Sequence, residues 1–140
     1  MEKFEIILFA ALFIHWIADF IFQSDEDAKN KSKSMKHLLS HTFTYSLTWF
    51  CALVLLKLSL IITNNDYYWI ESYCLYLFVL VTFTIHTITD YLTSRLNSKL
   101  WAEGKVHNFF VSIGFDQILH YIQLYFTIKY LLWLPTLQYL

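Results

Sequence analysis

Apolar residues fill four long stretches of this chain, and short polar stretches separate them. The apolar stretches cover residues 4–22, 38–63, 73–96 and 109–134. Each is close to or above the roughly 20 residues with which an α-helix crosses the hydrocarbon core of a bilayer. Helices joined by short connections pack as antiparallel neighbours. The pattern therefore predicts an all-α integral membrane protein, with residues 1–140 forming a single antiparallel four-helix bundle.

The composition agrees with a membrane protein and excludes several function classes. Hydrophobic residues make up 57% of the chain, aromatic residues make up 20%, and there are only two glycines. The formal net charge of −1 and the absence of a basic stripe exclude a nucleic-acid partner. Cys51 and Cys74 lie in different apolar stretches without Cys-x-x-Cys spacing, so no thiolate metal site is expected.

Basic residues in the connections predict the orientation in the membrane. The first connection carries Lys29, Lys31, Lys33 and Lys36, whereas the second, residues 64–71, carries neither Lys nor Arg. The third connection is again basic, with Arg95, Lys99 and Lys105 in and beside it. By the positive-inside rule the first and third connections are cytoplasmic. We therefore expect a multi-pass protein of the inner (plasma) membrane with both termini outside.

Ionisable residues interrupt all four apolar stretches. Three His and three Asp form pairs four residues apart, and a lone His lies in the second stretch: His15–Asp19, His86–Asp90, Asp116–His120 and His41. Residues at this spacing share one face of a helix. A carboxylate at the centre of a membrane helix costs about 2.5–3.5 kcal/mol, so it indicates a compensating partner and a function.

The seven residues are predicted to meet in one metal site. At a rise of about 1.5 Å per residue, all of them fall in or near the cytoplasmic half of the membrane. Imidazole and carboxylate groups on facing helices are the ligands of bundle metal centres, and Asp19, Asp90 and Asp116 are the candidate catalytic carboxylates. We expect one or two divalent transition-metal ions, with Zn²⁺ favoured and Mn²⁺ or Fe²⁺ as alternatives. The alternative structural interpretation is that the seven residues only join the helices by hydrogen bonds.

Further polar residues surround this predicted site. Gln23, Tyr45 and Gln117 are expected to orient the ligands, because each lies one turn or one residue from a candidate ligand. Lys31, Lys33 and Arg95 are expected to draw a phosphate group to the cytoplasmic rim. His37 and His107 fall in the predicted connections and are expected to be solvated.

The chain resembles the small bacterial and phage membrane proteins known as domain of unknown function 3307. The residues that carry the resemblance are His15-Trp-Ile-Ala-Asp19-Phe20 with Gln23, Leu38-Leu39-Ser-His41 with Tyr45, His86-Thr-Ile-Thr-Asp90, and Asp116-Gln117-Ile-Leu-His120. The family usually has Lys three residues after the Asp of the third span. This chain has Thr93 there, and Arg95 follows two positions later. The resemblance implies the same fold and the same set of site residues and does not specify a reaction.

The function that these observations favour is a metal-dependent membrane hydrolase. Its substrate would be a lipid or a lipid-linked phosphoryl or acyl group at the cytoplasmic leaflet. One alternative is a transporter or channel subunit that carries protons or divalent cations. Another is a non-enzymatic membrane effector stabilised by its metal. Bis-His haem binding fits less well, because three Asp are poor neighbours for an apolar macrocycle. The sequence is also compatible with a homo-oligomer.

Overall fold

The structure, a computed structural model, describes residues 2–63 and 72–134 of the chain. These residues are almost entirely helical and include no strand, which confirms the all-α class. In chain order the elements are α1 (Glu2–Trp16), the π-helix η1 (Ile17–Ile21), α2 (Asp25–Asn30), α3 (Met35–Ile62), α4 (Ser72–Ala102), α5 (Val106–Thr127) and the π-helix η2 (Ile128–Trp133).

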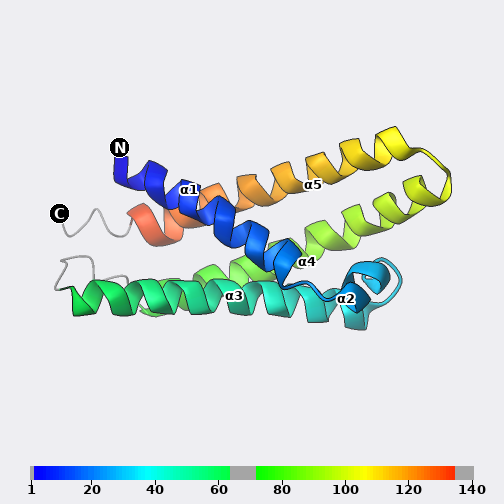
Figure 1. Ribbon diagram of the computed structural model, residues 1–140. Helices are drawn as coiled ribbons and strands as arrows, with labels where there is room; N and C mark the ends of the chain where they lie inside the picture. Colours follow the sequence, from blue (N-terminus) through cyan, green and yellow to red (C-terminus); the bar gives the residue numbers. More distant parts are fainter. Residues whose placement is uncertain (1, 64–71, 135–140) are drawn as a thin grey trace.

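The long helices lie along one another, and successive ones run in opposite directions (Figure 1). Helix α4 packs against both α3 and α5, and α1 with η1 contacts α3 and α5. This arrangement brings α2 and the α4–α5 turn to the same end of the molecule (Figure 1). We call it the loop end. The two basic connections therefore meet at the loop end, as the charge pattern requires of two connections on one side of a membrane.

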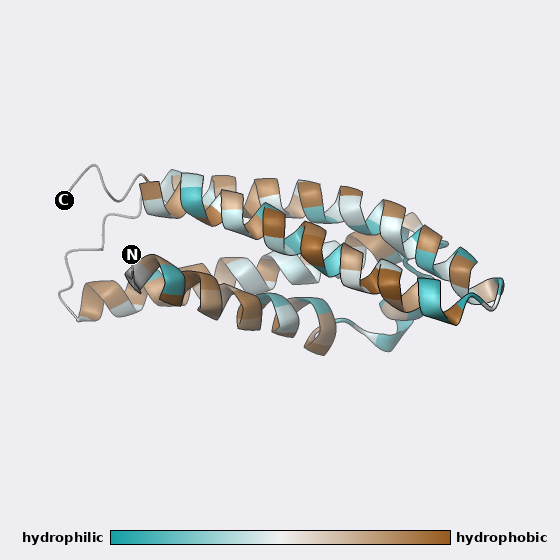
Figure 2. Ribbon diagram, turned by 90° about the horizontal axis from the view of Figure 1, so that it is seen from above, coloured by the Kyte–Doolittle hydropathy of each residue, from teal (hydrophilic) through white to brown (hydrophobic). Residues whose placement is uncertain are grey.

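The distribution of side chains is the reverse of that in a water-soluble protein. Apolar side chains on the outer surface are widely exposed, for example Phe9 (64%) and Leu80 (61%), and hydrophobic residues cover most of the long helices (Figure 2). The interior holds buried His, Asp and Thr side chains beside an apolar cluster around Trp49 and Phe78. Polar interiors with apolar exteriors are expected of a protein surrounded by lipid.

Three of the helical regions are long and apolar enough to cross a membrane: Phe4–Ile21, Met35–Ile62 and Ser72–Ala102. This finding is consistent with a membrane protein. The region predicted as a fourth span forms α5 and η2 and is not among the three. Its polar residues, which include Asp116, Gln117 and His120, lower its mean hydropathy.

Local sequence signals define the two connections at the loop end. Ser24 caps α2 by accepting a hydrogen bond from the backbone N–H of Asp27 at 3.1 Å, and acidic residues occupy the first turn of α2, where the helix dipole favours them. After α4, Gly104 has a φ of 68°, and the backbone N–H groups of Gly104 and Lys105 donate to Trp101 and Leu100. This is the Schellman ending, which requires a residue in the left-handed region, usually glycine.

The first apolar stretch departs from the predicted regular α-helix. At residues 17–21 it widens into η1, with the N–H of Phe22 donating to the carbonyl of Ile17 at 2.9 Å. Gln23 was expected one turn after Asp19 on the same helix, but it lies in a bend beyond the helix end. The predicted connection at residues 64–71 and the residues from 135 onward lie outside the described residues.

Candidate metal centre

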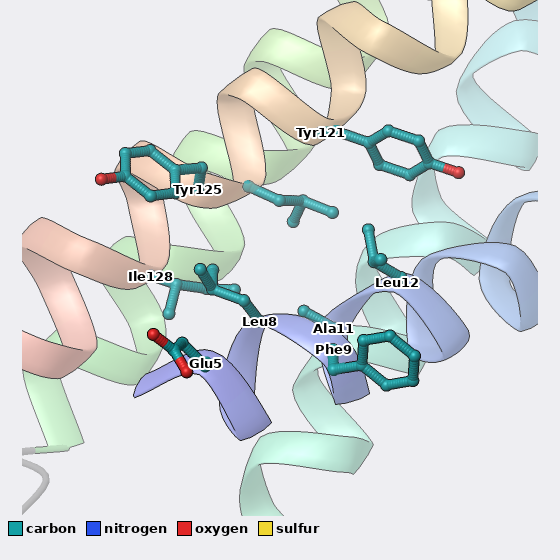
Figure 3. A pocket seen from close by; sticks show the side chains of 9 residues that line it. Glu5, Leu8, Phe9, Ala11, Leu12, Tyr121, Tyr125 and Ile128 are labelled. Atoms are coloured by element: carbon teal, nitrogen blue, oxygen red, sulfur yellow. The ribbon is translucent and has the colours of Figure 1, made fainter. Parts of the chain in front are cut away.

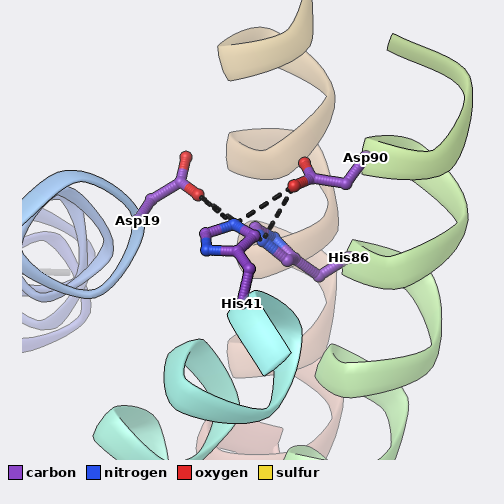
Figure 4. Close-up of side chains that lie close together, drawn as sticks. All are labelled: Asp19, His41, His86 and Asp90. Atoms are coloured by element: carbon purple, nitrogen blue, oxygen red, sulfur yellow. Dashed lines mark hydrogen bonds and ion pairs between the residues drawn. The ribbon is translucent and has the colours of Figure 1, made fainter. Parts of the chain in front are cut away.

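Four donor side chains meet in the interior near the loop end. Asp19 comes from η1, His41 from α3, and His86 and Asp90 from one face of α4 (Figure 4). All four residues are at most 4% exposed. The Nε2 atom of His41 lies 3.1 Å from Asp19 Oδ1 and 3.1 Å from Asp90 Oδ2. It also lies 3.2 Å from Nε2 of His86.

These distances are close to those between the donor atoms around one metal ion. Donor atoms bound at about 2.0–2.2 Å to a tetrahedral ion lie about 3.3–3.6 Å from one another. The distances from His41 are 3.1–3.2 Å, and those from His86 Nε2 to the two carboxylates are 3.5 and 3.9 Å. A single proton on His41 Nε2 cannot serve three neighbours. The group Asp19, His41, His86 and Asp90 can therefore hold a metal ion.

A second group of donors adjoins the first. Asp19, Asp116 and His120 bring their ligand atoms within 4.8 Å of one another, and these residues can also hold a metal ion. His120 Nε2 lies 3.4 Å from Asp116 Oδ1 and 3.2 Å from Asp90 Oδ1. Asp19 belongs to both groups, and Asp90 directs one oxygen to His41 and the other to His120. The two groups therefore share Asp19, and Asp90 connects them through its contact with His120.

Lys31 adds one positive charge to the cluster. It follows α2 and its Nζ donates to Asp90 Oδ2 at 2.7 Å. Burial by itself would lower the pKa of Lys31, but the charges of Asp90 and Asp19 outweigh it and raise that pKa. With neutral imidazoles, three carboxylates and one ammonium leave two negative charges, which one divalent ion neutralises.

His15 meets the cluster differently from the other three imidazoles. The Nε2 group of Gln117 donates to Asp19 Oδ2 at 3.2 Å and to Asp116 Oδ2 at 3.1 Å, so its Oε1 accepts from His15 Nε2 at 2.9 Å. The remaining nitrogen of His15, Nδ1, then accepts from the Tyr45 hydroxyl at 2.8 Å. Both nitrogens of His15 are engaged by neutral groups, and His15 lies outside the two metal-holding groups.

Tyr45 and Gln117, which were predicted to orient the ligands, both contact residues of the cluster. The Tyr45 ring also stacks on the His86 imidazole, with centroids 3.8 Å apart and planes 9° from parallel. Thr93 also contacts the cluster, although it was not predicted as a site residue. Its hydroxyl donates to Asp116 Oδ1 at 2.6 Å, although its place three residues after Asp90 puts it on the same face of α4. A hydroxyl therefore stands where the family pattern usually has a lysine.

A cavity of about 620 Å³ opens beside the cluster at the loop end. Asp19, Asp116 and Gln117 line one part of it, whereas the four imidazoles are at most 1% exposed and lie deeper. Gln23 and Lys31 also line the cavity. We call this space the loop-end cavity.

Of the three residues predicted at the rim, only Lys31 lines the loop-end cavity. Lys33 is exposed, and Arg95 donates to the Tyr91 carbonyl and stacks on the Tyr91 ring. Neither residue lines the loop-end cavity. A separate cavity of about 340 Å³ lies between α1 and α5, where mainly apolar side chains line it and the exposed Glu5 lies at its edge (Figure 3).

His107 is exposed as expected, but the expectation for His37 is wrong. His37 lies in the first turn of α3 with its side chain only 17% exposed, and its Nδ1 lies 2.9 Å from Asp27 Oδ1. The sequence placed it in a connection because α3 begins three residues earlier than the apolar pattern does.

Comparison with known proteins agrees with the resemblance seen in the sequence. The family model described as protein of unknown function (DUF3307) matches residues 7–139. The chain belongs to this family. The match spans nearly all of this DUF3307 protein, including every residue of the two metal-holding groups. No curated protein and no solved structure matches the chain.

Proposed function

We propose that this protein is a metal-dependent membrane hydrolase that acts on a lipid or a lipid-linked phosphoryl or acyl group. The observation that carries the proposal is the convergence of four buried donors, with ligand atoms all within 4.8 Å of one another: Asp19, His41, His86 and Asp90. The second group adjoins the loop-end cavity through Asp19 and Asp116, so a substrate there would reach it. Zinc is the favoured ion, and two adjoining groups that share Asp19 favour a pair of ions.

The same proposal includes the arrangement in the membrane. The helices form an antiparallel four-helix bundle in the inner membrane, with the loop end in the cytoplasmic leaflet and both termini outside. The exposed apolar surface and the joining of both basic connections at the loop end support this placement. The site then lies just below the head groups, where a lipid substrate presents its ester bonds.

Each group of the site has a role in this chemistry. Bound divalent ions supply Lewis acidity and a water of lowered pKa. Asp116 is 13% exposed on its side chain and lines the cavity, which makes it the better-placed carboxylate to accept a proton. The Gln117 amide orients Asp19 and Asp116 by donating a hydrogen bond to each. His15 orients Gln117 by a hydrogen bond to its Oε1. Tyr45 donates to His15 and stacks on His86.

Metal content and lipid turnover test the proposal together. We expect protein purified in mild detergent to retain about one to two equivalents of a transition metal and to release phosphate or fatty acid from a bacterial lipid extract. His41→Ala and Asp116→Ala should lose metal and turnover, whereas His107→Ala, an exposed histidine at the same end, should keep both. Less than about 0.2 equivalents after reconstitution with Zn²⁺, Mn²⁺ and Fe²⁺ would refute a metal centre.

One observation favours proton or cation handling as a second candidate. The imidazoles form a chain, because His86 contacts His41 through Nε2 and His120 through Nδ1, each at 3.2 Å. Against transport, the interior beyond the cluster is filled by Trp49, Phe78 and Leu124. Proton or Zn²⁺ flux into liposomes that depends on His86 would favour this candidate over hydrolysis.

A further inference from the structure

The loop-end cavity contains polar atoms that lack a partner. Nε2 of Gln23, Oγ of Ser94 and Oδ1 of Asn97 are buried and have no hydrogen-bond partner among the described residues. All three side chains line the cavity. A buried polar group without a partner costs about 1–3 kcal/mol. Three such groups around one space indicate a ligand that supplies their hydrogen bonds.

Two ammonium groups line the cavity and balance its two carboxylates, and one of these ammonium groups can still pair with an anionic ligand. Lys31 is paired with Asp90 at 2.7 Å. Among the described residues, Lys29 forms its ion pair with a fully exposed carboxylate at 3.6 Å, so its ammonium is the one available to the ligand. Gln23 Nε2 can only donate, Ser94 can donate or accept, and Asn97 presents an amide. A phosphate oxygen would accept from the donors, and a hydroxyl of the head group, such as the P–OH of a phosphate monoester, would donate to Oδ1 of Asn97.

The rest of the lining is apolar and aromatic. Phe20, Trp101, Phe109, Phe110 and Ile113 line the cavity beside the polar atoms. Phe20 and Phe110 are also 48% and 62% exposed on the outer surface, so the cavity continues toward the surface that lipid would cover. Its volume of about 620 Å³ falls within the usual range of ligand pockets, about 300–1,000 Å³.

We infer that the loop-end cavity binds the phosphate-bearing head group of an anionic phospholipid. Gln23, Ser94 and Asn97 are its recognition residues, and the aromatic side chains contact the adjoining glycerol and acyl segments. This inference deepens the proposed function, on which its catalytic meaning rests, by naming the substrate class. The binding itself uses residues outside the two metal-holding groups, so it can be measured separately.

Trp101 provides a direct probe, because it lines the cavity. The full chain in dodecyl maltoside micelles is titrated with dioleoyl phosphatidic acid, and tryptophan emission is recorded for the chain and for Trp101→Phe. We expect a saturable change in the unsubstituted chain that Trp101→Phe lacks. Separate titrations with dioleoyl phosphatidylcholine and with inorganic phosphate should give responses at least about tenfold weaker.

Two substitutions test the recognition residues. Asn97→Ala and Ser94→Ala, each read through Trp101, should weaken phosphatidic acid binding about tenfold, as expected for losing one hydrogen bond to a charged group. Asn108→Ala is the matched control, because Asn108 is exposed at the same end and does not line the cavity. Circular dichroism melting confirms that each variant is folded.

The outcomes separate this inference from the proposed function. Equal binding of phosphatidylcholine would show an unspecific apolar pocket, and equal binding of inorganic phosphate would show a site for a soluble anion. Either result, or unchanged binding in both Asn97→Ala and Ser94→Ala, overturns the inference even if the protein retains metal. Selective binding that depends on Asn97 upholds it, even if metal analysis refutes the hydrolase.

Discussion

Asp90 is the residue at which the contacts of the cluster converge. Its Oδ1 faces His120, and its Oδ2 lies 3.1 Å from His41 Nε2 and 2.7 Å from Lys31 Nζ. The Oδ2 atom therefore serves both the ammonium and the first metal-holding group. A divalent ion bound there would repel the ammonium, so Lys31 and the ion compete for the same oxygen.

Replacing Lys31 should therefore lower the stability of the metal-free protein more than that of the metal-bound protein. In Lys31→Met the metal-free form loses the ammonium that pairs with the buried Asp90, and we expect a loss of up to about 3 kcal/mol of stability. The loaded form should change little, because the ion neutralises Asp90. Thermal melting with and without chelator measures the difference.

Lys29→Met is the control for this comparison. Lys29 is 76% exposed and pairs with an Asp25 that is 97% exposed, so its substitution should leave both melting temperatures unchanged. An equal loss of stability in the loaded and stripped forms of Lys31→Met would contradict competition for Asp90.

At the scale of elements, α2 is attached to α3 by a small acidic network. Asp27 accepts a hydrogen bond from the Ser40 hydroxyl at 3.0 Å and lies 2.9 Å from His37 Nδ1. Burial tends to raise the pKa of Asp27, but the hydrogen bonds from His37, Ser24 and Ser40 outweigh it and lower that pKa. This attachment holds α2 at the position from which Lys31 reaches Asp90.

Acid should release α2 before the rest of the fold. Because the folded pKa of Asp27 lies below its ordinary value of 3.8, its contribution is complete above that value and is lost as the pH falls through the folded pKa. At neutral pH, Asp27→Asn should lower the stability of α2 by about 1–3 kcal/mol. Hydrogen exchange of the α2 amides measures this loss, and the difference from the unsubstituted protein should vanish in strong acid.

Asp25→Asn is the matched control, since Asp25 lies in the same turn and is fully solvated. Faster exchange of α2 in Asp25→Asn than in Asp27→Asn would show that helix capping, and not the contact with His37 and Ser40, holds α2.

The long helices and the His/Asp pairs within single helices were predictable, because both follow from the local periodicity of the sequence. Apolar length located the long helices, and the spacing of four put His86 with Asp90 on one face. The widened turn η1 was not predictable, because no residue in Ile17–Ile21 is a glycine or proline that would mark an irregular backbone. Likewise, the separation of His15 from the metal-holding groups depends on Gln117, which comes from α5 and is remote in sequence.

For the whole molecule, the joining of the two basic connections at one end makes the orientation testable. In a chain with Cys51 and Cys74 replaced by alanine, single cysteines at Lys33 and Lys99 should be labelled from the cytoplasmic side. A cysteine at Asn65, in the connection outside the described residues, should be labelled from the outer side. Labelling of the cysteines at positions 33 and 99 from opposite sides would contradict the structure. If these two cysteines were labelled from the outer side and the cysteine at position 65 from the cytoplasmic side, the site would lie in the outer leaflet.

The order of the helices also bears on how the protein is made. Asp19, His41, His86 and Asp90 have all been synthesised by the end of α4, whereas Asp116 and His120 arrive only with α5. A nascent chain that ends at Ala102 therefore already carries the complete first group of donors, with its carboxylates still without the contacts of His120 and Gln117. Helix α5 then completes the second group and one wall of the cavity, so the site can mature only after α5 has been made.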